Sequence, residues 1–580
     1  MTTVPEASVA GGPPPAVDTG RPGPFGLTAS RSAHVLRSLW RARIAFVFTF
    51  GMPLAWLILV GIVAGNEVID PVTDLRVMQF ATPTALAMGC LFATLPSIAI
   101  GVALDRESLV LKRLRGTPLP SWVYVAAQVV AVALLAAASV AVVLAVAILA
   151  YGVTVPGDAV LPLVVTIVVA LLSFSAIGIA VASLASSARS TEAITIGAVV
   201  VLSFISGVFI IGGELPEWLE QVAWALPLKP FVVSLQELFN PYDDLPWNLG
   251  HLALIAAWGV GGAIVAALAF RWEPRAGRRA AARAAAGEGR AAAGAAAGRS
   301  GGTSAAAILD RVESGQPTAL TRTLGQVGAA VRSTLRRPGD LFFAVAVPLG
   351  LVWLLVTLQG GGERDGIPLI TSTAAAMCAW GVAVVAFMNT AEWLARSAEQ
   401  GILKRWRGTP LSTGEIGVGR AVAAVVVAWV IAAAMLLLGA AAFELRTTAT
   451  GILLSAGVVV LGVAALAACG VLLATAVPDA RASGAVALLL LFVIAFFSDV
   501  FVVGGPDWMR TVGAFFPLTH LRQGLLEAWR PDGPFIAWAA IGILVAWAAG
   551  AMIATWILER SRGASWTAAG RRPKTPRDAA

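Results

Sequence analysis

Two short basic stretches of the chain are nearly identical. They read LKRLRGTPL from Leu111 and LKRWRGTPL from Leu403, and eight of their nine residues agree. A loop with several Lys and Arg side chains can serve as a charge signal for membrane topology or as a contact for a partner protein. Topology needs charge, but it does not need Gly-Thr-Pro-Leu at a fixed spacing. The repeated shape therefore favours the contact with a partner protein.

Each basic stretch is typical of a short interfacial helix followed by a rigid bend. Apolar residues share one helical face and the cations point elsewhere. Glu107 and Glu399 lie near the helix starts, where the helix dipole favours negative charge. Gly116 and Gly408 suit a C-terminal cap, and a proline then stops each helix. The residues assigned to this contact are Glu107, Lys112, Arg113, Arg115, Gly116, Thr117 and Pro118, and Glu399, Lys404, Arg405, Arg407, Gly408, Thr409 and Pro410.

Catalytic and metal sites are not indicated by the sequence. Cys90, Cys378 and Cys469 lie in apolar runs without CxxC or Cys/His spacing, which predicts packing residues. A P-loop requires Gly-Lys, whereas every lysine of this chain follows Leu or Pro. No segment outside the apolar runs is long enough for a nucleotide-binding domain. We therefore expect no catalytic residue, no metal and no cofactor bound by the chain itself.

Composition indicates an all-α polytopic membrane protein. Hydrophobic residues make up 58% of the chain and charged residues 13%, and the mean hydropathy is +0.82. Runs of about 20 apolar residues are the length that a helix needs to cross a hydrocarbon core. Such runs predict about twelve transmembrane helices in two six-helix bundles, at 44–64, 80–104, 121–151, 160–184, 193–212 and 249–270, and at 341–358, 367–391, 416–442, 451–477, 483–503 and 534–558.

Charge and composition also predict the orientation and the domain boundaries. The net charge of +8 does not indicate nucleic-acid binding, because the cations flank apolar runs without stacking aromatics. The excess of Lys and Arg in alternate loops places both termini and the linker in the cytoplasm. The expected organisation is a disordered start (1–30), a first unit (31–275), a low-complexity linker (276–315), a second unit (316–562) and a disordered tail (563–580).

The internal repeat extends well beyond the basic stretches. Pro53 in the first apolar run has a counterpart in Pro348, and GGELPEWLEQVAWALPL from Gly212 resembles GGPDWMRTVGAFFPL from Gly504. Landmarks that recur in order over such a long period indicate a duplicated bundle rather than a solenoid. Because each unit has an even number of spans, the two units keep the same orientation in the membrane.

The basic stretch, preceded by Glu and placed between a second and a third span, closely resembles the cytoplasmic loop of type-2 ABC exporter permeases. The resemblance implies interfacial helices at 31–43 and 322–337, coupling helices that dock on an ATPase at 105–118 and 393–410, and re-entrant helical pairs at 214–239 and 506–529. Most members of that family supply one unit per chain and dimerise. This chain resembles a fused tandem of two units.

The resemblance also implies the function. The chain would be the permease of an exporter in the plasma membrane that moves an amphipathic drug, antibiotic or lipid-like compound outward. Two separate ABC ATPase subunits would supply the ATP and Mg chemistry. Gate residues would come from the re-entrant pairs, although an interfacial loop anchored by tryptophans explains them equally well. These gate candidates are Pro216, Trp218, Pro227, Pro506, Trp508 and Pro517.

Two polar residues are candidates for a substrate cavity, and one other class of transporter competes with this interpretation. Ser97 and Asn389 occupy equivalent positions in the second spans, where helix packing is the alternative role. A proton-coupled secondary transporter is the competing class, because GVALDRESL from Gly101 begins like a motif of such proteins. That motif fails after Arg106, and the spans contain few carboxylates to carry protons. A membrane scaffold without transport would explain neither the duplication nor the bends.

Overall fold

The structure of the protein is a computed structural model. It describes residues 23–41, 47–70, 75–117, 120–208, 216–240, 247–270, 319–335, 342–358, 362–364, 366–406, 408–409, 413–501 and 507–561. The expected linker and C-terminal tail lie outside these ranges, as do Pro118, Arg407, Pro410 and Pro506.

The described residues of the first unit are helical apart from one short antiparallel hairpin and the connecting turns. Its elements are α1 (Pro24–Arg41), η1 (Val47–Gly51), α3 (Met52–Val63), β1 (Val68–Asp70), β2 (Leu75–Arg76), α4 (Val77–Glu107), α5 (Val110–Arg115), α6 (Ser121–Tyr151), α7 (Val160–Leu184), α8 (Ala188–Ile205), α9 (Glu217–Ala225), α10 (Leu228–Phe239) and α11 (Leu249–Ala269).

The second unit repeats this order of elements. They are α14 (Ala319–Leu335), η2 (Phe342–Ala346), α16 (Val347–Leu358), β3 (Glu363–Arg364), β4 (Ile367–Pro368), α17 (Leu369–Ala383), η3 (Val384–Met388), α18 (Asn389–Glu399), α19 (Ile402–Trp406), α20 (Thr413–Phe443), α21 (Ala449–Ala476), α22 (Ala480–Phe497), α23 (Asp507–Gly513), α24 (Pro517–Ala528) and α25 (Trp538–Ser561). The one difference in the second span is that a π-helical turn, η3, divides it, whereas α4 is continuous.

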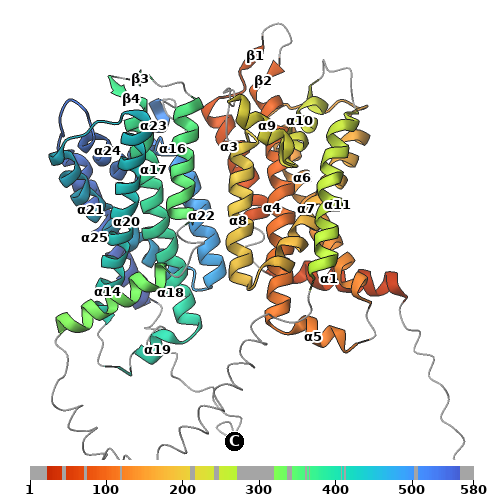
Figure 1. The fold of residues 1–580 in the computed structure, drawn as a ribbon, viewed down its shortest axis with the longest axis horizontal. Helices are drawn as coiled ribbons and strands as arrows, with labels where there is room; N and C mark the ends of the chain where they lie inside the picture. Colours follow the sequence, from red (N-terminus) through yellow and green to blue (C-terminus); the bar gives the residue numbers. More distant parts are fainter. Residues whose placement is uncertain are drawn as a thin grey trace, which may run out of the picture.

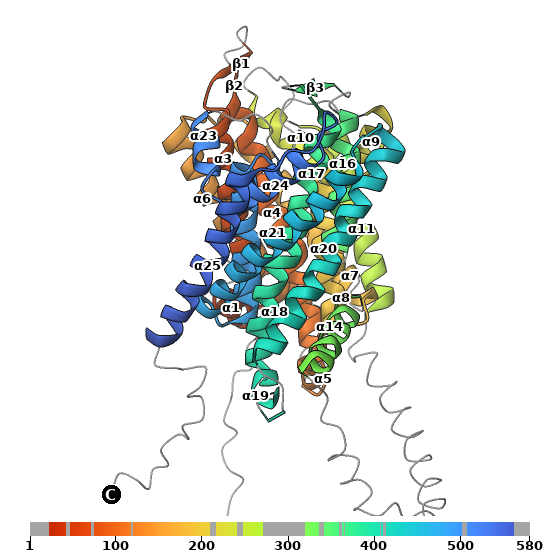
Figure 2. The same cartoon turned by 90° about the vertical axis from the view of Figure 1, so that its left-hand side faces the viewer.

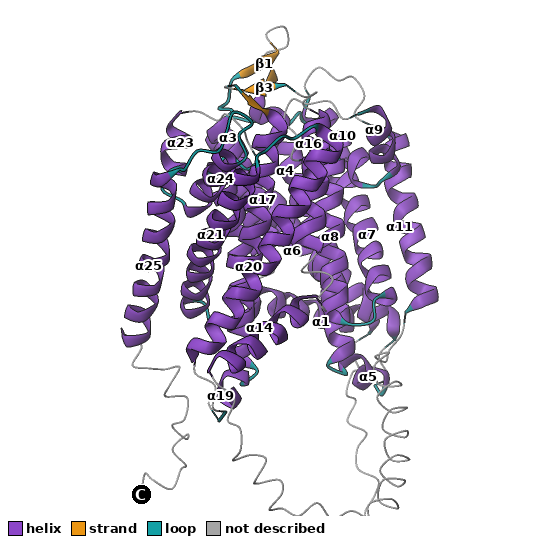
Figure 3. Ribbon diagram, turned by 60° about the vertical axis from the view of Figure 1, so that its left-hand side comes forward, coloured by secondary structure: helices purple, strands orange, loops and turns teal. Residues whose placement is uncertain are grey.

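The two units stand side by side, and their ends are of two kinds (Figure 1). One end carries the β1–β2 and β3–β4 hairpins and is called the hairpin end. The other carries α5 and α19, with α1 and α14 lying across the bundle just above them, and is called the elbow end (Figures 1 and 2). Nearly everything between the ends is helix (Figure 3).

The all-α membrane architecture predicted from the sequence is confirmed. Among the described residues, eight helices are long and apolar enough to cross a membrane, namely α4, α6, α7, α11, the continuous α17–α18 segment, α20, α21 and α25. Four shorter apolar helices, at 49–63, 190–205, 344–357 and 482–497, occupy the positions of the first and fifth spans of each unit. Helices satisfy their backbone polar groups internally, which a hydrocarbon environment requires.

One predicted boundary is wrong. Helix α1 begins at Pro24, inside the segment 1–30 that was expected to be disordered. It is amphipathic, with buried Ser32 and Val35 on the side that packs against α6. The Pro- and Gly-rich composition that predicted disorder therefore does not extend to residues 24–30, which continue a helix that is held on α6 by its apolar face.

Local sequence explains where several spans begin. Asn248 and Thr448 accept hydrogen bonds from the backbone N–H groups of His251 and Gly451, at the starts of α11 and α21. Ser187 forms a capping box with Ser190 at the start of α8. Such caps satisfy donors that have no partner within the helix.

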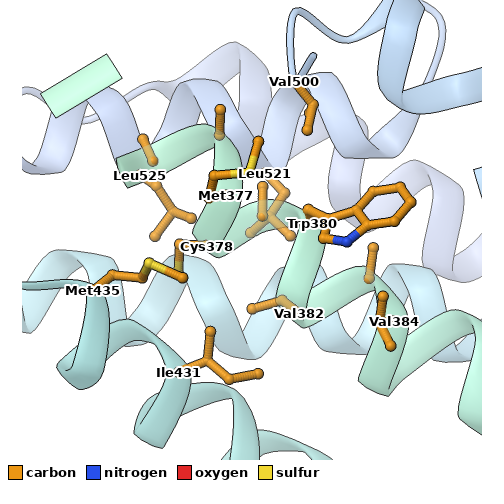
Figure 4. Close-up of a cluster of buried hydrophobic side chains, with 14 of the residues drawn as sticks. Met377, Cys378, Trp380, Val382, Val384, Ile431, Met435, Val500, Leu521 and Leu525 are labelled. Carbon is orange, nitrogen blue, oxygen red and sulfur yellow. The ribbon is translucent and has the colours of Figure 1, made fainter. Parts of the chain in front are cut away.

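The second span of each unit is the most enclosed helix. Most side chains of α4, and of α17 with η3, are buried by the surrounding spans. In the second unit Met377, Cys378 and Trp380 meet Ile431 and Leu521 from neighbouring helices (Figure 4). Cys90 and Cys378 are buried free thiols, in agreement with their predicted packing role.

The units meet along a seam of aromatic side chains. Helices α8 and α22 lie between the two bundles (Figure 1). Phe501 packs against Trp380 with ring centroids 4.9 Å apart and against Phe204 of the first unit at 6.4 Å. Trp56 of the first unit meets Phe496 at 5.9 Å. These rings, together with Phe492, are called the seam cluster.

Two equivalent glycines bring the fourth span onto the second span. A Cβ atom at Gly178 of α7 would lie 2.9 Å from the carbonyl oxygen of Leu95 in α4, and one at Gly470 of α21 would lie 2.6 Å from that of Phe387. Real Cβ atoms are essentially never this close to a backbone oxygen. Small residues allow such close approach, which is a principal source of helix association in membranes.

Replacing Gly470 with Ala should therefore destabilise the protein. The new methyl group would push α21 away from η3, and overpacking typically costs about 1–3 kcal/mol. Gly457 provides a matched control in the same helix, because nothing lies within 4 Å of its would-be Cβ. We expect a lower thermal unfolding midpoint in detergent for Gly470→Ala and an unchanged or higher one for Gly457→Ala. Equal midpoints for the two variants would contradict the close packing.

Candidate functional site

The candidate site is the pair of bends at the elbow end. Helices α5 and α19 project beyond α4 and α18 (Figures 1 and 2). Each begins after a residue in the left-handed region, Leu109 with φ 60° and Gly401 with φ 66°. These two residues turn the chain between the second span and α5 or α19, the two helices predicted to be coupling helices. The left-handed conformation costs a non-glycine residue roughly 1–2 kcal/mol, so the first bend carries strain that the second avoids.

The C-terminal ends of the coupling helices depend on threonine as well as on the predicted glycine caps. Gly116 is the C-cap residue of α5, as predicted, but its φ of −79° is one that any residue can adopt. The hydroxyl groups of Thr117 and Thr409 add contacts there, because they donate to the carbonyl oxygens of Leu114 and Trp406, each at 2.6 Å. The conformational freedom of glycine is needed at the other side of the elbow, where Gly401 adopts a positive φ.

The apolar face of each coupling helix is used inside the protein. Leu111 is fully buried in a cluster with Ile98 and Tyr124. Trp406 lies 6.0 Å from Trp393, centroid to centroid, and the guanidinium carbon of Arg420 sits 4.1 Å from the centre of the Trp393 ring. Packing of Leu111 therefore holds α5 on its unit, and the contact of Trp406 with Trp393 holds α19 on a ring that Arg420 of α20 fixes by cation–π attraction.

The cations are left on the outer surface of the elbow. The side chains of Lys112, Arg113 and Arg115 are exposed in the first unit, as are those of Lys404 and Arg405 in the second. Leu109, at the bend, is 44% exposed beside them. The arrangement offers a partner protein a basic surface with a small apolar contribution, and such a surface selects a partner with complementary charge.

Glu107 and Glu399 do not act on the coupling helices as predicted. Glu107 is the last residue of α4, and its carboxylate accepts a hydrogen bond of 2.8 Å from the backbone N–H of Ala188, the first residue of α8. Glu399 accepts one of 2.7 Å from Ala480, the first residue of α22. Each carboxylate therefore complements the dipole of the fifth span, a tertiary contact, rather than that of the adjacent coupling helix.

Arg106 is a site residue that the sequence reasoning did not identify. Its side chain is buried and donates to the carbonyl oxygens of Ala182 at 2.8 Å and Ala185 at 2.9 Å, at the end of α7. The sequence shows only an arginine in a basic loop, which suggested a topology signal. The equivalent residue of the second unit is Ala398, whose side chain has no donor to offer.

A polar network next to Arg106 anchors the interfacial helix of the first unit. The phenol of Tyr124 in α6 donates to Asp105 Oδ2 at 2.9 Å, and Arg31 Nη2 of α1 lies 3.9 Å from the same oxygen. In the second unit Arg322 of α14 pairs with Glu415 of α20 at 3.0 Å. The ion pair ties α1 to the second span, and Arg31 also lies 5.8 Å from the centre of the Tyr124 ring in the third span. In the second unit the ion pair ties α14 to the third span.

The predicted gate residues that the structure describes lie at the hairpin end. Pro216 and Pro227 immediately precede α9 and α10, while Pro517 is the first residue of α24. Trp218 and Trp508 are exposed, the latter also contacting Phe497. The second helix of each pair buries one face among the spans, α10 against α4 and α7, and α24 against α17 and α21. This packing supports re-entrant pairs, and their role as a gate stays a prediction.

The two candidate cavity residues stay a prediction as well. Ser97 and Asn389 are both partly buried in the second spans. The pocket of about 210 Å³ found at the hairpin end is lined by α4 and α10 residues, including Gln79 and Glu237, but by neither candidate. In the part of the chain that the structure describes, no group of three or more His, Cys, Asp or Glu side chains could hold a metal ion.

Comparison with known families agrees with the duplication. The family described as ABC-2 type transporter matches the chain twice, at residues 32–240 and 329–528, and these matches cover more than half of it. Both matches are to a membrane domain, and each spans one unit from its interfacial helix to its second hairpin-end helix. The chain has no significant match among the curated proteins.

The elbow geometry predicts unequal effects for two glycine substitutions in the second unit. Gly401→Ala should destabilise the protein by about 1 kcal/mol, because alanine is strained at a positive φ. Gly408→Ala should be close to neutral, since its would-be Cβ meets only Arg405 O at 3.4 Å and its φ lies outside the left-handed region. Thermal unfolding of the purified variants measures both. A larger loss of stability for Gly408→Ala than for Gly401→Ala would show instead that the C-terminal cap of α19 requires glycine.

Proposed function

The chain belongs to the family of ABC-2 type transporters, and from this premise we propose that it is a fused permease of an ATP-driven exporter. In this proposal two ATPase subunits, supplied by other chains, dock on α5 and α19, and the permease moves an amphipathic small molecule outward. The observation that carries the proposal is the pair of equivalent coupling helices at one end of the molecule, each packed by its apolar side and exposing its cations.

The electrostatics of the two ends support a cytoplasmic elbow end. Arg37 and Arg560 join the coupling-helix cations there. The hairpin end carries acidic residues, among them Asp158, Glu217 and Glu220. Cytoplasmic loops hold the excess of Lys and Arg in multi-pass membrane proteins. An ATPase in the cytoplasm would therefore reach both coupling helices.

The seam between the units supports an amphipathic substrate. The seam cluster contains aromatic rings from both units, and Phe501 contacts three of them, those of Trp380, Phe492 and Phe496. Aromatic walls bind the apolar part of a ligand by contact area and ring geometry. The rings are packed together in this structure, so in our proposal they separate during transport, and a compound with an apolar body would fit between them better than a sugar or an ion.

The family match removes the main support for a proton-coupled transporter. Two carboxylates that could have carried protons are also occupied in ion pairs, Glu392 with Arg396 and Asp499 with Arg522. The energy source in this proposal is therefore ATP, hydrolysed by the partner subunits.

Charge reversal at the coupling helices should release the ATPase. In a complex of the permease with its ATPase, Arg113→Glu with Arg115→Glu, or Arg405→Glu with Arg407→Glu, should lower the ATPase retained on the purified permease at least tenfold per site. Repulsive or unpaired interface charges cost several kcal/mol, and about 1.4 kcal/mol is a factor of ten. The measurement is the ATPase-to-permease ratio after affinity purification.

Two exposed arginines at the hairpin end provide a matched control. Arg76→Glu with Arg446→Glu makes the same charge change, and it should leave the ratio at two ATPases per permease. Full retention of the ATPase by both coupling-helix variants would show that the basic stretches serve topology alone.

The orientation is tested separately by cysteine labelling. In a variant whose native cysteines are replaced by alanine, Asp158→Cys in the exposed turn before α7 should react with an impermeant thiol reagent applied to intact cells. Gly294→Cys in the linker should react only after permeabilisation. Labelling of Gly294→Cys in intact cells would reverse the assigned orientation.

A further inference from the structure

We propose that Glu107 and Glu399 are positioning residues that transmit movement of the coupling helices to α8 and α22, the helices at the seam. This inference rests on the proposed function, because it assumes that an ATPase moves α5 and α19. It assigns the two glutamates to force transmission within the permease rather than to the docking surface.

The geometry is the same in both units. Each carboxylate and its backbone donor are 81 residues apart, and the two bond lengths, 2.8 and 2.7 Å, are nearly equal. In both cases the donor is the first residue of the fifth span, so the negative charge lies at the positive end of that helix. Charge-assisted bonds of this type are shorter and stronger than neutral ones.

The glutamates are rigidly connected to the coupling helices. Only Ser108 and Leu109 separate Glu107 from Val110, where α5 begins. Ser108 bonds back to Leu104 through both its N–H at 2.9 Å and its hydroxyl group at 2.7 Å. A push on α5 therefore displaces the end of α4 and its terminal carboxylate together.

The receiving helices are suited to change the seam. Helix α8 carries Phe204 and α22 carries Phe492 and Phe496, which belong to the seam cluster. Both helices are short, with 18 residues each. A displacement applied at the first residue of such a helix tilts the whole helix, and the aromatic contacts at its far end must then rearrange.

The two connections differ in strength. In the first unit Arg106 also holds the end of α7. Residues 182, 185 and 188, at the end of α7 and the start of α8, are therefore all hydrogen-bonded to the end of α4. In the second unit Ala398 replaces Arg106, and Glu399 bonds to Ala480 without this additional grip. Loss of Glu399 should therefore reduce transmission more than loss of Glu107.

Spin-label distances across the seam test the proposal without knowledge of the substrate. Labels at Val201 of α8 and Leu490 of α22, both exposed positions, report the separation of the two helices in the complex with its ATPase. The unsubstituted complex should show a distance change between the nucleotide-free and the ATP-bound states. With Glu107→Ala and Glu399→Ala combined, ATP turnover should remain within about threefold while the distance change falls at least twofold.

Conservative variants and a control separate transmission from folding. Glu107→Gln and Glu399→Gln retain an acceptor oxygen and should keep most of the distance change, whereas Glu444→Ala, in an exposed position at the hairpin end, should keep all of it. Hydrogen exchange at 186–190 and 478–482 should be faster in the alanine variants. If the alanine variants fail to fold, the glutamine variants are measured alone. Hydrogen exchange at 186–190 and 478–482 that equals that of the unsubstituted protein would then contradict a charge-assisted bond from each glutamate to the fifth span.

Each contrary result has a distinct meaning. An unchanged distance change in the double alanine variant would overturn the inference and leave the proposed function intact. Loss of the ATPase from that variant would also overturn it, because the glutamates would then belong to the docking surface. Absence of any nucleotide-dependent distance change in the unsubstituted complex would overturn the inference together with the proposed function.

Discussion

The close contact between the second and fourth spans is the constraint on which each unit depends. Lipid offers no hydrophobic gain for helix association, so spans associate through close packing and polar contacts. Gly178 and Gly470 let α7 and α21 approach the backbone of the second span at equivalent places, opposite Leu95 and Phe387. This contact holds the second span at the centre of its unit. The same span ends at the elbow, so the central helix of each bundle is also the one that carries the coupling helix.

The elements predictable from the sequence were those set by local composition. Apolar run length located the spans, and the repeated basic stretch located α5 and α19, because both signals lie within one helix or loop. The Glu107–Ala188 bond joins residues 81 positions apart, and nothing near Glu107 indicates the partner. The burial of Arg106 likewise depends on the distant end of α7. The left-handed bend at Leu109 could not be predicted, because leucine rarely adopts a positive φ.

Fusion of the units allows each copy to diverge. At the elbow end the Leu111 cluster and the Asp105–Tyr124 pair hold the first coupling helix and its surroundings, whereas Trp393 and Trp406 take this role in the second. A homodimer presents two identical surfaces, but this chain presents two different supports behind similar cations. In the proposed function, the contacts with the ATPase could therefore stay alike while the mechanical response of each unit differs.

The fifth spans show this divergence most clearly at the hairpin end. Gly207 after α8 and Asp499 after α22 share a left-handed backbone, with φ 76° and 51°. In the second unit Asp499 uses that turn to pair with Arg522 of α24 at 2.9 Å, whereas Gly207 has no side chain with which to do so. Partly buried ion pairs resist separation, because breaking one leaves two desolvated charges. Helix α22 is therefore tied to the elbow at one end and to the re-entrant pair at the other. Under the proposed transmission, a movement that reaches α22 would be passed on to α24, whereas α8 lacks the equivalent ion pair and would move more independently of α10.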